Sequence, residues 1–118
     1  MKTATAEASL SDEEAALMLS ALGSLPRLAI YRALLRSGRQ GLNVSELQGE
    51  TEIPPSTLKH HVSALIDSGL VEQERRTREV YSTARIQEVR RLSAFLLREC
   101  CADVTRLADT RARAGRHA

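Results

Sequence analysis

Aromatic residues are scarce in this 118-residue chain, which contains no tryptophan, one phenylalanine and two tyrosines. We therefore do not expect the aromatic platforms on which single-stranded nucleic acids and sugars stack. Hydrophobic residues make up 42% of the chain, but no run of them approaches the ~18–20 residues that a membrane-spanning helix needs. The first residues turn acidic without an apolar segment, so they do not resemble a secretory signal. These features predict one cytoplasmic domain with an aliphatic core.

Cysteine, glycine and proline are also rare. The two cysteines, Cys100 and Cys101, are adjacent, whereas a secreted scaffold of this size would space several cysteines to staple its loops. Six glycines and three prolines leave little sequence for long irregular loops. The chain has no phosphate-binding glycine loop, dinucleotide-binding motif or metal-hydrolase motif, so we do not expect an enzyme.

The positive charge of the chain is concentrated in one region. Fifteen of the 17 basic residues are arginine, and the net charge is +2. Residues 1–26 carry one lysine and four acidic residues, whereas residues 71–91 carry six arginines and four glutamates. Arginine suits bidentate contacts with phosphates and base edges. This distribution fits a nucleic-acid-binding protein without establishing one.

Local signals predict four helices after a flexible arm over residues 1–10. Ser11 and Glu14 form a capping box at the start of the first helix. Prolines mark the starts of the second and fourth helices, since proline is tolerated in a first turn. We expect the apolar side chains of Leu25, Leu28 and Val44 to face inward. The expected helices span residues 11–22, 24–37, 44–49 and 54–67, with a short strand at position 42.

A hairpin and a long helix are expected next. Residues 70–75 and 79–83 are predicted strands, joined by a turn at residues 76–78 that lacks glycine and asparagine. One helical stripe then continues from Ile86 to about Ala108. Such an apolar stripe is longer than the small body needs, which favours packing against a partner chain. We therefore assign residues 11–108 to one domain that includes its own dimerisation helix, followed by a flexible basic tail over residues 109–118.

This element order predicts a winged helix-turn-helix, a mostly α fold with a small β-hairpin wing. The fourth helix has short polar donors and one cation opposite its apolar stripe, a set that suits base edges and phosphates. The alternative is an ordinary solvated helix face. The arginines near the hairpin tip favour DNA, whereas His61 borders the core and is interpreted as structural. The expected DNA-binding residues are Ser56, Thr57, Lys59, His60, Ser63, Arg75, Arg76 and Arg78.

Several segments resemble the ArsR/SmtB family of winged-helix repressors. The resemblance covers roughly residues 11–107 and rests on residues 24–28 (SLPRL), 56–62 (STLKHHV), 68–71 (SGLV) and 75–81 (RRTREVY). Family wings often carry a glycine at the tip, and this one does not. The resemblance implies a homodimer held by the first and last helices. It also implies that each subunit binds half of an inverted-repeat operator on double-stranded DNA, and that an inducer lowers the affinity.

The resemblance also bears on the inducer. The third helix contains no cysteine, so the cysteine-rich metal site that some family members carry there is absent. The zinc site of other members is incomplete, because the last helix offers Asp103 and Asp109 but no histidine before His117. Residues 99–102 (ECCA) resemble the vicinal cysteine pair of an arsenic-responsive subgroup. This likeness implies a trivalent arsenical as inducer rather than as a permanent cofactor, with Cys100 and Cys101 as ligands.

The chemistry of the pair leaves alternatives open. Trivalent arsenic prefers thiolates, and two thiolates per subunit favour a methylated arsenical, or arsenite with a third ligand from elsewhere. Neighbouring helical residues point about 100° apart, so chelation requires local adjustment. Both cysteines could instead be packing residues, or they could sense redox change, reactive sulfur or another metal. A winged helix that binds only proteins is a further alternative.

Overall fold

The computed structural model describes residues 9–98 of the chain. These residues form helices and one antiparallel hairpin, which confirms the expected fold class. The predictions for the N-terminal residues 1–8, for the end of the last helix with Cys100 and Cys101, and for the basic tail lie outside the described residues. In chain order the elements are α2 (Asp12–Leu22), α3 (Leu25–Ser37), the 3-10 turn η1 (Gly38–Gln40), α4 (Val44–Thr51), α5 (Pro55–Asp67), β1 (Val71–Arg76), β2 (Glu79–Ala84) and α6 (Ile86–Arg98).

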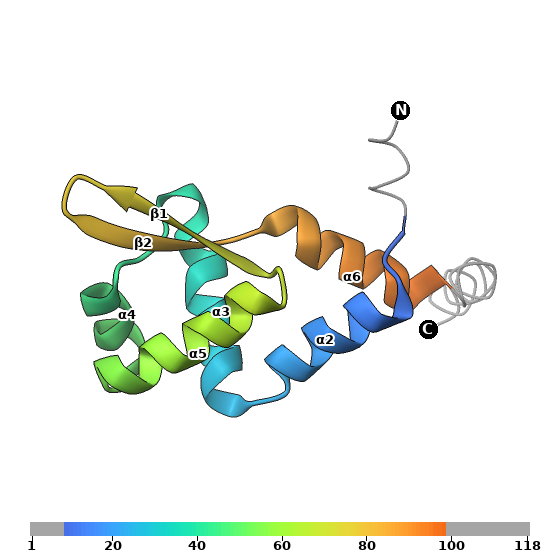
Figure 1. Ribbon diagram of the computed structural model, residues 1–118, viewed down its shortest axis with the longest axis horizontal. Coiled ribbons are helices and arrows are strands. Elements are labelled where there is room, and N and C mark those ends of the chain that lie inside the picture. The colour runs from blue at the N-terminus through green and yellow to red at the C-terminus, as the bar shows by residue number, and fades with distance from the viewer. Residues whose placement is uncertain (1–8, 99–118) are drawn as a thin grey trace, which may run out of the picture.

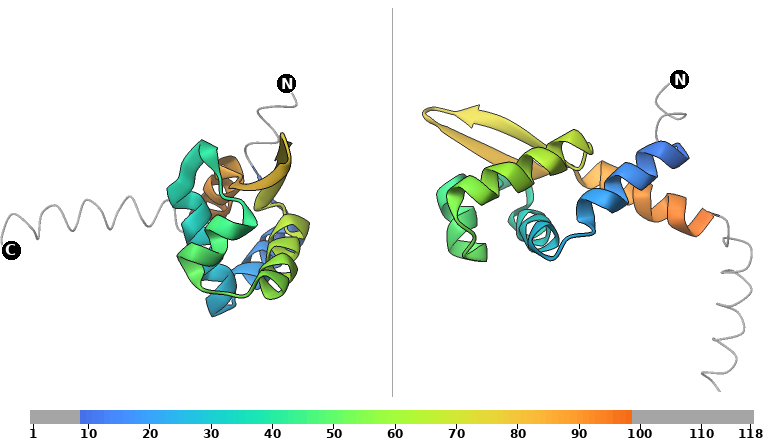
Figure 2. Two further views of the ribbon diagram at one scale, coloured as in Figure 1. Left: turned by 90° about the vertical axis from the view of Figure 1, so that its left-hand side faces the viewer. Right: turned by 60° about the horizontal axis from the view of Figure 1, so that its bottom comes forward.

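The elements divide into two ends (Figure 1). Helices α4 and α5 and the hairpin lie at one end, whereas α2 and α6 run side by side at the other, as a second view also shows (Figure 2). A single core joins the two ends, because every helix from α2 to α6 contributes a buried apolar side chain to it. The bulkiest of its fully buried members are Tyr31, Ile30, Leu34, Leu47, Leu58 and Leu65.

Two capping boxes set the starts of helices. Ser11 Oγ accepts a hydrogen bond from the Glu14 amide at 3.0 Å, and Glu14 Oε1 accepts one from the Ser11 amide at 2.9 Å. This confirms the predicted start of α2. Asn43 and Glu46 repeat the arrangement at the start of α4, with distances of 2.8 and 3.0 Å. Each box satisfies amides that a helix N-terminus otherwise leaves unpaired.

Three predicted core positions are wrong. Leu25 is 82% exposed, Leu28 39% and Val44 37%. Helix α3 buries Ile30 and Leu34 instead, which are four residues apart and therefore lie on one face. Leu25 begins the helix, where the chain has only just turned from α2. The apolar pattern gave the correct helix but too broad a buried face.

Two boundaries differ from the expected ones because residues adopt left-handed backbone. Helix α4 runs to Thr51, two residues further than predicted, and Glu52 (φ 60°) closes it. The hairpin turn contains only two residues, since Arg76 pairs with Glu79. Thr77 supplies the positive φ of 56° that glycine would normally provide in such a turn. A β-branched residue is rarely found there.

The start of the domain is held against α6. Leu10 is 4% exposed and belongs to the core, although the sequence placed it in the flexible arm. Arg91 Nη2 donates to the carbonyl oxygen of Ser9 at 2.9 Å, and Arg91 Nη1 pairs with Glu88 at 2.9 Å. The described part of the arm, residues 9 and 10, is therefore packed against α6.

Candidate DNA-binding surface

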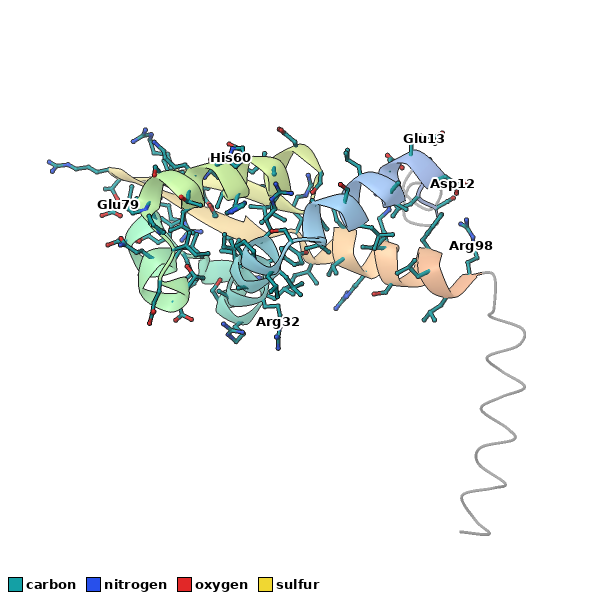
Figure 3. All side chains as sticks on the ribbon, turned by 90° about the horizontal axis from the view of Figure 1, so that it is seen from below. Asp12, Glu13, Arg32, His60, Glu79 and Arg98 are labelled. Carbon is teal, nitrogen blue, oxygen red and sulfur yellow. The ribbon has the colours of Figure 1, made fainter. Side chains whose placement is uncertain are left out.

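Helix α5 has a buried face and a polar outward face. Leu58, Val62 and Leu65 recur at helical spacing and are buried, whereas the neighbouring Ile66 is only half-buried. Figure 3 shows His60 on this helix. All five α5 residues that the sequence assigned to DNA binding are exposed: Ser56, Thr57, Lys59, His60 and Ser63. The helix thus presents hydroxyl groups, one imidazole and one ammonium to solvent, which are groups able to bond base edges and phosphates.

Two of the three wing arginines are free to meet a ligand. Arg75 and Arg78 are exposed and lie on either side of Thr77 at the tip of the hairpin. Arg75 Nη1 donates to the Arg78 carbonyl oxygen at 3.4 Å, a contact confined to the tip. Their positive charge extends the polar surface beyond α5, in the position from which a wing reaches DNA alongside a recognition helix.

Arg76 is engaged within the protein. Its Nη1 donates to the Gln40 carbonyl oxygen at 2.7 Å, and its Nη2 donates to the Arg39 carbonyl oxygen at 3.4 Å. Nη2 also lies 3.2 Å from Glu74 Oε1. The guanidinium carbon is 4.6 Å from the ring centroid of Tyr81, within cation–π range. Arg76 therefore differs from the two other wing arginines with which the sequence grouped it.

His61 occupies the structural position expected for it. It is half-buried, and Arg27 Nε on α3 donates to its Nδ1 at 3.1 Å. Burial lowers the pKa of the His61 imidazole, and the positive charges of Arg27 and His60 lower it further. A neutral imidazole is required, because a protonated Nδ1 cannot accept the Arg27 bond. The bond joins α3 to α5 behind the exposed face of the recognition helix.

A pocket of about 210 Å3 separates part of α5 from the wing. Direct packing between the recognition helix and the hairpin is incomplete there, so contacts elsewhere contribute to the position of the wing. Val44 borders this space, which explains its exposure. The lining residues are Val44, Leu47, Leu58, Lys59, Val62, Ser63, Gln73, Val80 and Ser82.

The segment over residues 38–43 supplies those other contacts, and we call it the wing-support segment. Leu42 and Ser82 exchange two backbone hydrogen bonds of 3.0 and 2.9 Å, which confirms the predicted short strand. Asn43 Nδ2 donates to Glu79 Oε1 at 2.7 Å. The sequence predicted a short connection with a strand at Leu42 here, but not its contacts with the wing. The Asn-x-x-Glu capping pattern at residues 43–46 was the signal that could have marked Asn43.

Between residues 9 and 98, no group of three or more His, Cys, Asp or Glu side chains could hold a metal ion. The predicted arsenical ligands Cys100 and Cys101 lie outside that range. None of the described helices is long and apolar enough to cross a membrane.

A helix-turn-helix followed by a hairpin, with a polar outward helix and exposed arginines at the wing tip, defines a winged helix-turn-helix protein. A helix-turn-helix domain model matches residues 27–74. No curated protein sequence matches the chain. The fold resembles an ArsR-like transcriptional regulator from Rhodococcus sp. RHA1, with a TM-score of 0.67 and 24% identity over 86% of this chain and 92% of that one.

The family follows from a second solved structure. HlyU from Vibrio cholerae N16961 is 30% identical over 75% of this chain and 94% of its own, with a TM-score of 0.60. HlyU in its reduced form gives 26% identity over 75% and 90% of the two chains, with a TM-score of 0.57. The chain belongs to the ArsR family of winged helix-turn-helix transcription regulators, which are not enzymes.

Proposed function

We propose that this regulator is a cytoplasmic, homodimeric repressor that binds an inverted-repeat operator and releases it when a trivalent arsenical binds. The exposed polar face of α5 carries this proposal. Helix α5 would enter the major groove, with Lys59 and His60 toward base edges and Ser56, Thr57 and Ser63 toward phosphates or bases. Arg75 and Arg78 would contact phosphates or the minor groove beside it. Two copies would place their recognition helices ~34 Å apart, one turn of DNA.

The exposed leucines at the α2–α6 end support a dimer. Leu17 is 54% exposed, Leu19 43% and Leu96 52%. Exposed apolar side chains at one end of a molecule favour association when a partner can cover them. A second copy packed on this end would cover them and leave both recognition helices free. The same packing would set the distance between the two helices.

Cys100 and Cys101 are the proposed inducer ligands. Thiolates bind trivalent arsenic, which is a soft ion. The two thiols would bind a monomethylated arsenical fully, because that species has only two exchangeable positions on arsenic. The pair begins two residues after Arg98, the last residue of α6 that the structure describes. An inducer there that prefers a DNA-incompetent dimer would release the operator, since a few kcal/mol of differential affinity suffices.

A redox or reactive-sulfur signal is the second candidate. One structure similar to this chain is HlyU described as reduced, so a redox state has been distinguished for that protein. The same two thiols would then react with an oxidant or a persulfide. Other soft metals would use the same ligands.

One experiment separates these candidates. A mobility shift on the duplex upstream of the gene would be measured without inducer, then with methylarsenite, arsenite, zinc or hydrogen peroxide. We expect methylarsenite to release the DNA at least as well as arsenite. The double variant Cys100→Ser/Cys101→Ser should bind DNA as the wild type does but resist release. Release by peroxide alone would replace the arsenical with a redox signal.

The matched control changes the DNA surface and leaves the cysteines intact. The double variant Lys59→Ala/His60→Ala should bind more weakly by about 10- to 100-fold, the worth of one or two base or phosphate contacts. The arsenical should still affect whatever binding remains. Unchanged release by the double serine variant would remove the cysteine pair from the proposal. Unchanged binding by the double alanine variant would remove the α5 face.

A further inference from the structure

Beyond its base, where Val71 is buried in the core and β2 leads into α6, the wing is attached to the wing-support segment at two places. The first is at Ser82, whose backbone pairs with Leu42 through two hydrogen bonds. The second is at the pair Arg76 and Glu79, the last register pair before the turn. Both members of that pair are tied to the wing-support segment. Arg76 donates to the carbonyl oxygens of residues 39 and 40, and Glu79 accepts from Asn43.

Two attachment points have a mechanical consequence. Ser82 and Glu79 are three residues apart, so the attachments are separated by ~10 Å along the strand. A hairpin held only at its base and at Ser82 could still tilt its tip, because the pocket beside α5 leaves room between helix and wing. Holding it again near the tip fixes its angle. Figure 3 places Glu79 beside α4, at the end of the molecule that holds the wing.

The contacts of Arg76 hold its guanidinium group against the protein. Its guanidinium group lies over the Tyr81 ring and bonds two backbone carbonyl groups and Glu74. Only a third of its side-chain surface is exposed. A phosphate contact would compete with these bonds. Asn43 meanwhile caps α4, so the Glu79 tie links the wing to the first residue of the helix-turn-helix.

We propose that Arg76 and Glu79 are positioning residues that fix the angle of the wing against the helix-turn-helix, so that Arg75 and Arg78 reach DNA together with α5. The inference rests on the proposed DNA-binding function for its consequence, although the attachment itself is a property of the free protein. Arg76 thus raises DNA affinity without neutralising a phosphate.

The first test compares the salt dependence of binding to a short mixed-sequence duplex. Each lost phosphate contact flattens the slope of log K against log salt by about 0.9. Arg75→Ala and Arg78→Ala should each flatten it. Arg76→Leu, which keeps the apolar stem, should weaken binding about 3- to 10-fold, the worth of about one hydrogen bond, with the slope unchanged. A slope change in Arg76→Leu equal to that in Arg78→Ala would overturn the proposal.

Glu79 provides a pair of variants with equal charge. Glu79→Gln and Glu79→Ala both remove a negative charge near DNA, but only glutamine keeps a carbonyl oxygen for Asn43 Nδ2. If charge alone mattered, both variants would bind DNA more tightly than the wild type, and by the same factor. The proposal predicts that Glu79→Ala binds more weakly than Glu79→Gln, about 3- to 10-fold, as the loss of a single hydrogen bond would cost. Equal affinities would overturn it, and this pair decides the matter even if Arg76→Leu fails to fold.

A measurement without DNA separates the proposal from the function on which it rests. Residual dipolar couplings of backbone amides give the orientation of the hairpin relative to α4 and α5 in the free protein. Wild type and Arg75→Ala should fit one rigid body. In the double variant Arg76→Leu/Glu79→Ala, the couplings of the hairpin amides should no longer agree with the orientation that fits α4 and α5. An unchanged fit would overturn the proposal that Arg76 and Glu79 fix the angle of the wing. A wild type that binds no DNA would contradict only the proposed function.

Discussion

At the scale of single residues, one partly buried hydrogen bond links the stability of the domain to pH. Arg27 Nε donates to His61 Nδ1, and burial followed by the charges of Arg27 and His60 lowers the pKa of His61. A histidine whose pKa is lower in the folded state binds protons more readily when unfolded. The stability that it contributes is therefore fully present above its unfolded pKa and is lost as the pH falls towards the folded pKa.

We expect His61→Gln to reduce the loss of stability as the pH falls from about 7.5 through the ordinary histidine pKa of about 6.5. Glutamine can still accept from Arg27 through its carbonyl oxygen but does not titrate. The free energy of unfolding, measured by urea denaturation at several pH values, checks this. His60→Gln is the comparison variant, because it removes only the last of the three causes that lower the His61 pKa and should change the pH dependence less than His61→Gln does. Equal pH dependence in wild type and His61→Gln would contradict the expectation.

At the scale of elements, the wing depends on a glycine that permits close approach. Gly41 has a φ of 70°, and a Cβ there would collide with the Ser82 carbonyl oxygen and Thr83 Cγ2. The backbone of the wing-support segment can therefore lie directly against β2 only where no side chain intervenes. Gly49, in contrast, lies within α4 with open space around its Cα.

These two glycines give predictions of opposite sign. Gly41→Ala should destabilise the domain by about 2 kcal/mol or more, since it combines a positive φ with a backbone collision. Gly49→Ala should stabilise it by about 0.5–1 kcal/mol, the difference in helix propensity. Thermal or urea unfolding measures both changes. Amide exchange at Leu42 and Ser82 should quicken in Gly41→Ala alone, and equal exchange in the two variants would count against this role for Gly41.

The helix boundaries could be predicted from the sequence better than the contacts between distant elements. Capping residues and prolines predicted the helix starts within a residue or two, because these signals act locally. The roles of Gly41, Asn43 and Arg76 could not be predicted, since each depends on a partner some 36 to 41 residues away. The exposed residues of α5 were predicted as a group by periodicity alone, whereas three neighbouring wing arginines looked equivalent until packing distinguished them.

At the scale of the whole molecule, the α2–α6 end is the expected dimer surface. Leu17 and Leu96 lie on α2 and α6 and are each more than half exposed. Leu25 is more exposed still, at 82%, but begins α3. Exposure by itself therefore does not identify the interface. Substitutions at the α2–α6 end and at the start of α3 distinguish the two surfaces.

We expect the double variant Leu17→Glu/Leu96→Glu to shift the protein from dimer to monomer, because it places two charges on each side of the interface. Leu25→Glu is the matched control and should leave the dimer intact. Analytical ultracentrifugation at micromolar concentration measures both. A dimer disrupted only by Leu25→Glu would move the interface to the start of α3, and a monomeric wild type would remove the dimer from the proposed function.

The placement of the wing-support segment also determines which edge of the hairpin is open to pairing with another chain. Leu42 covers the outer side of β2 near Ser82, which leaves β1 as the open edge of the sheet among residues 9–98. Open strand edges invite pairing with another chain and hence aggregation. Here that edge has the sequence Val-Glu-Gln-Glu-Arg-Arg, and all but its first and last residues are exposed. An added strand would bring its own backbone against this row of charges, so the edge of the wing is protected from unwanted strand addition.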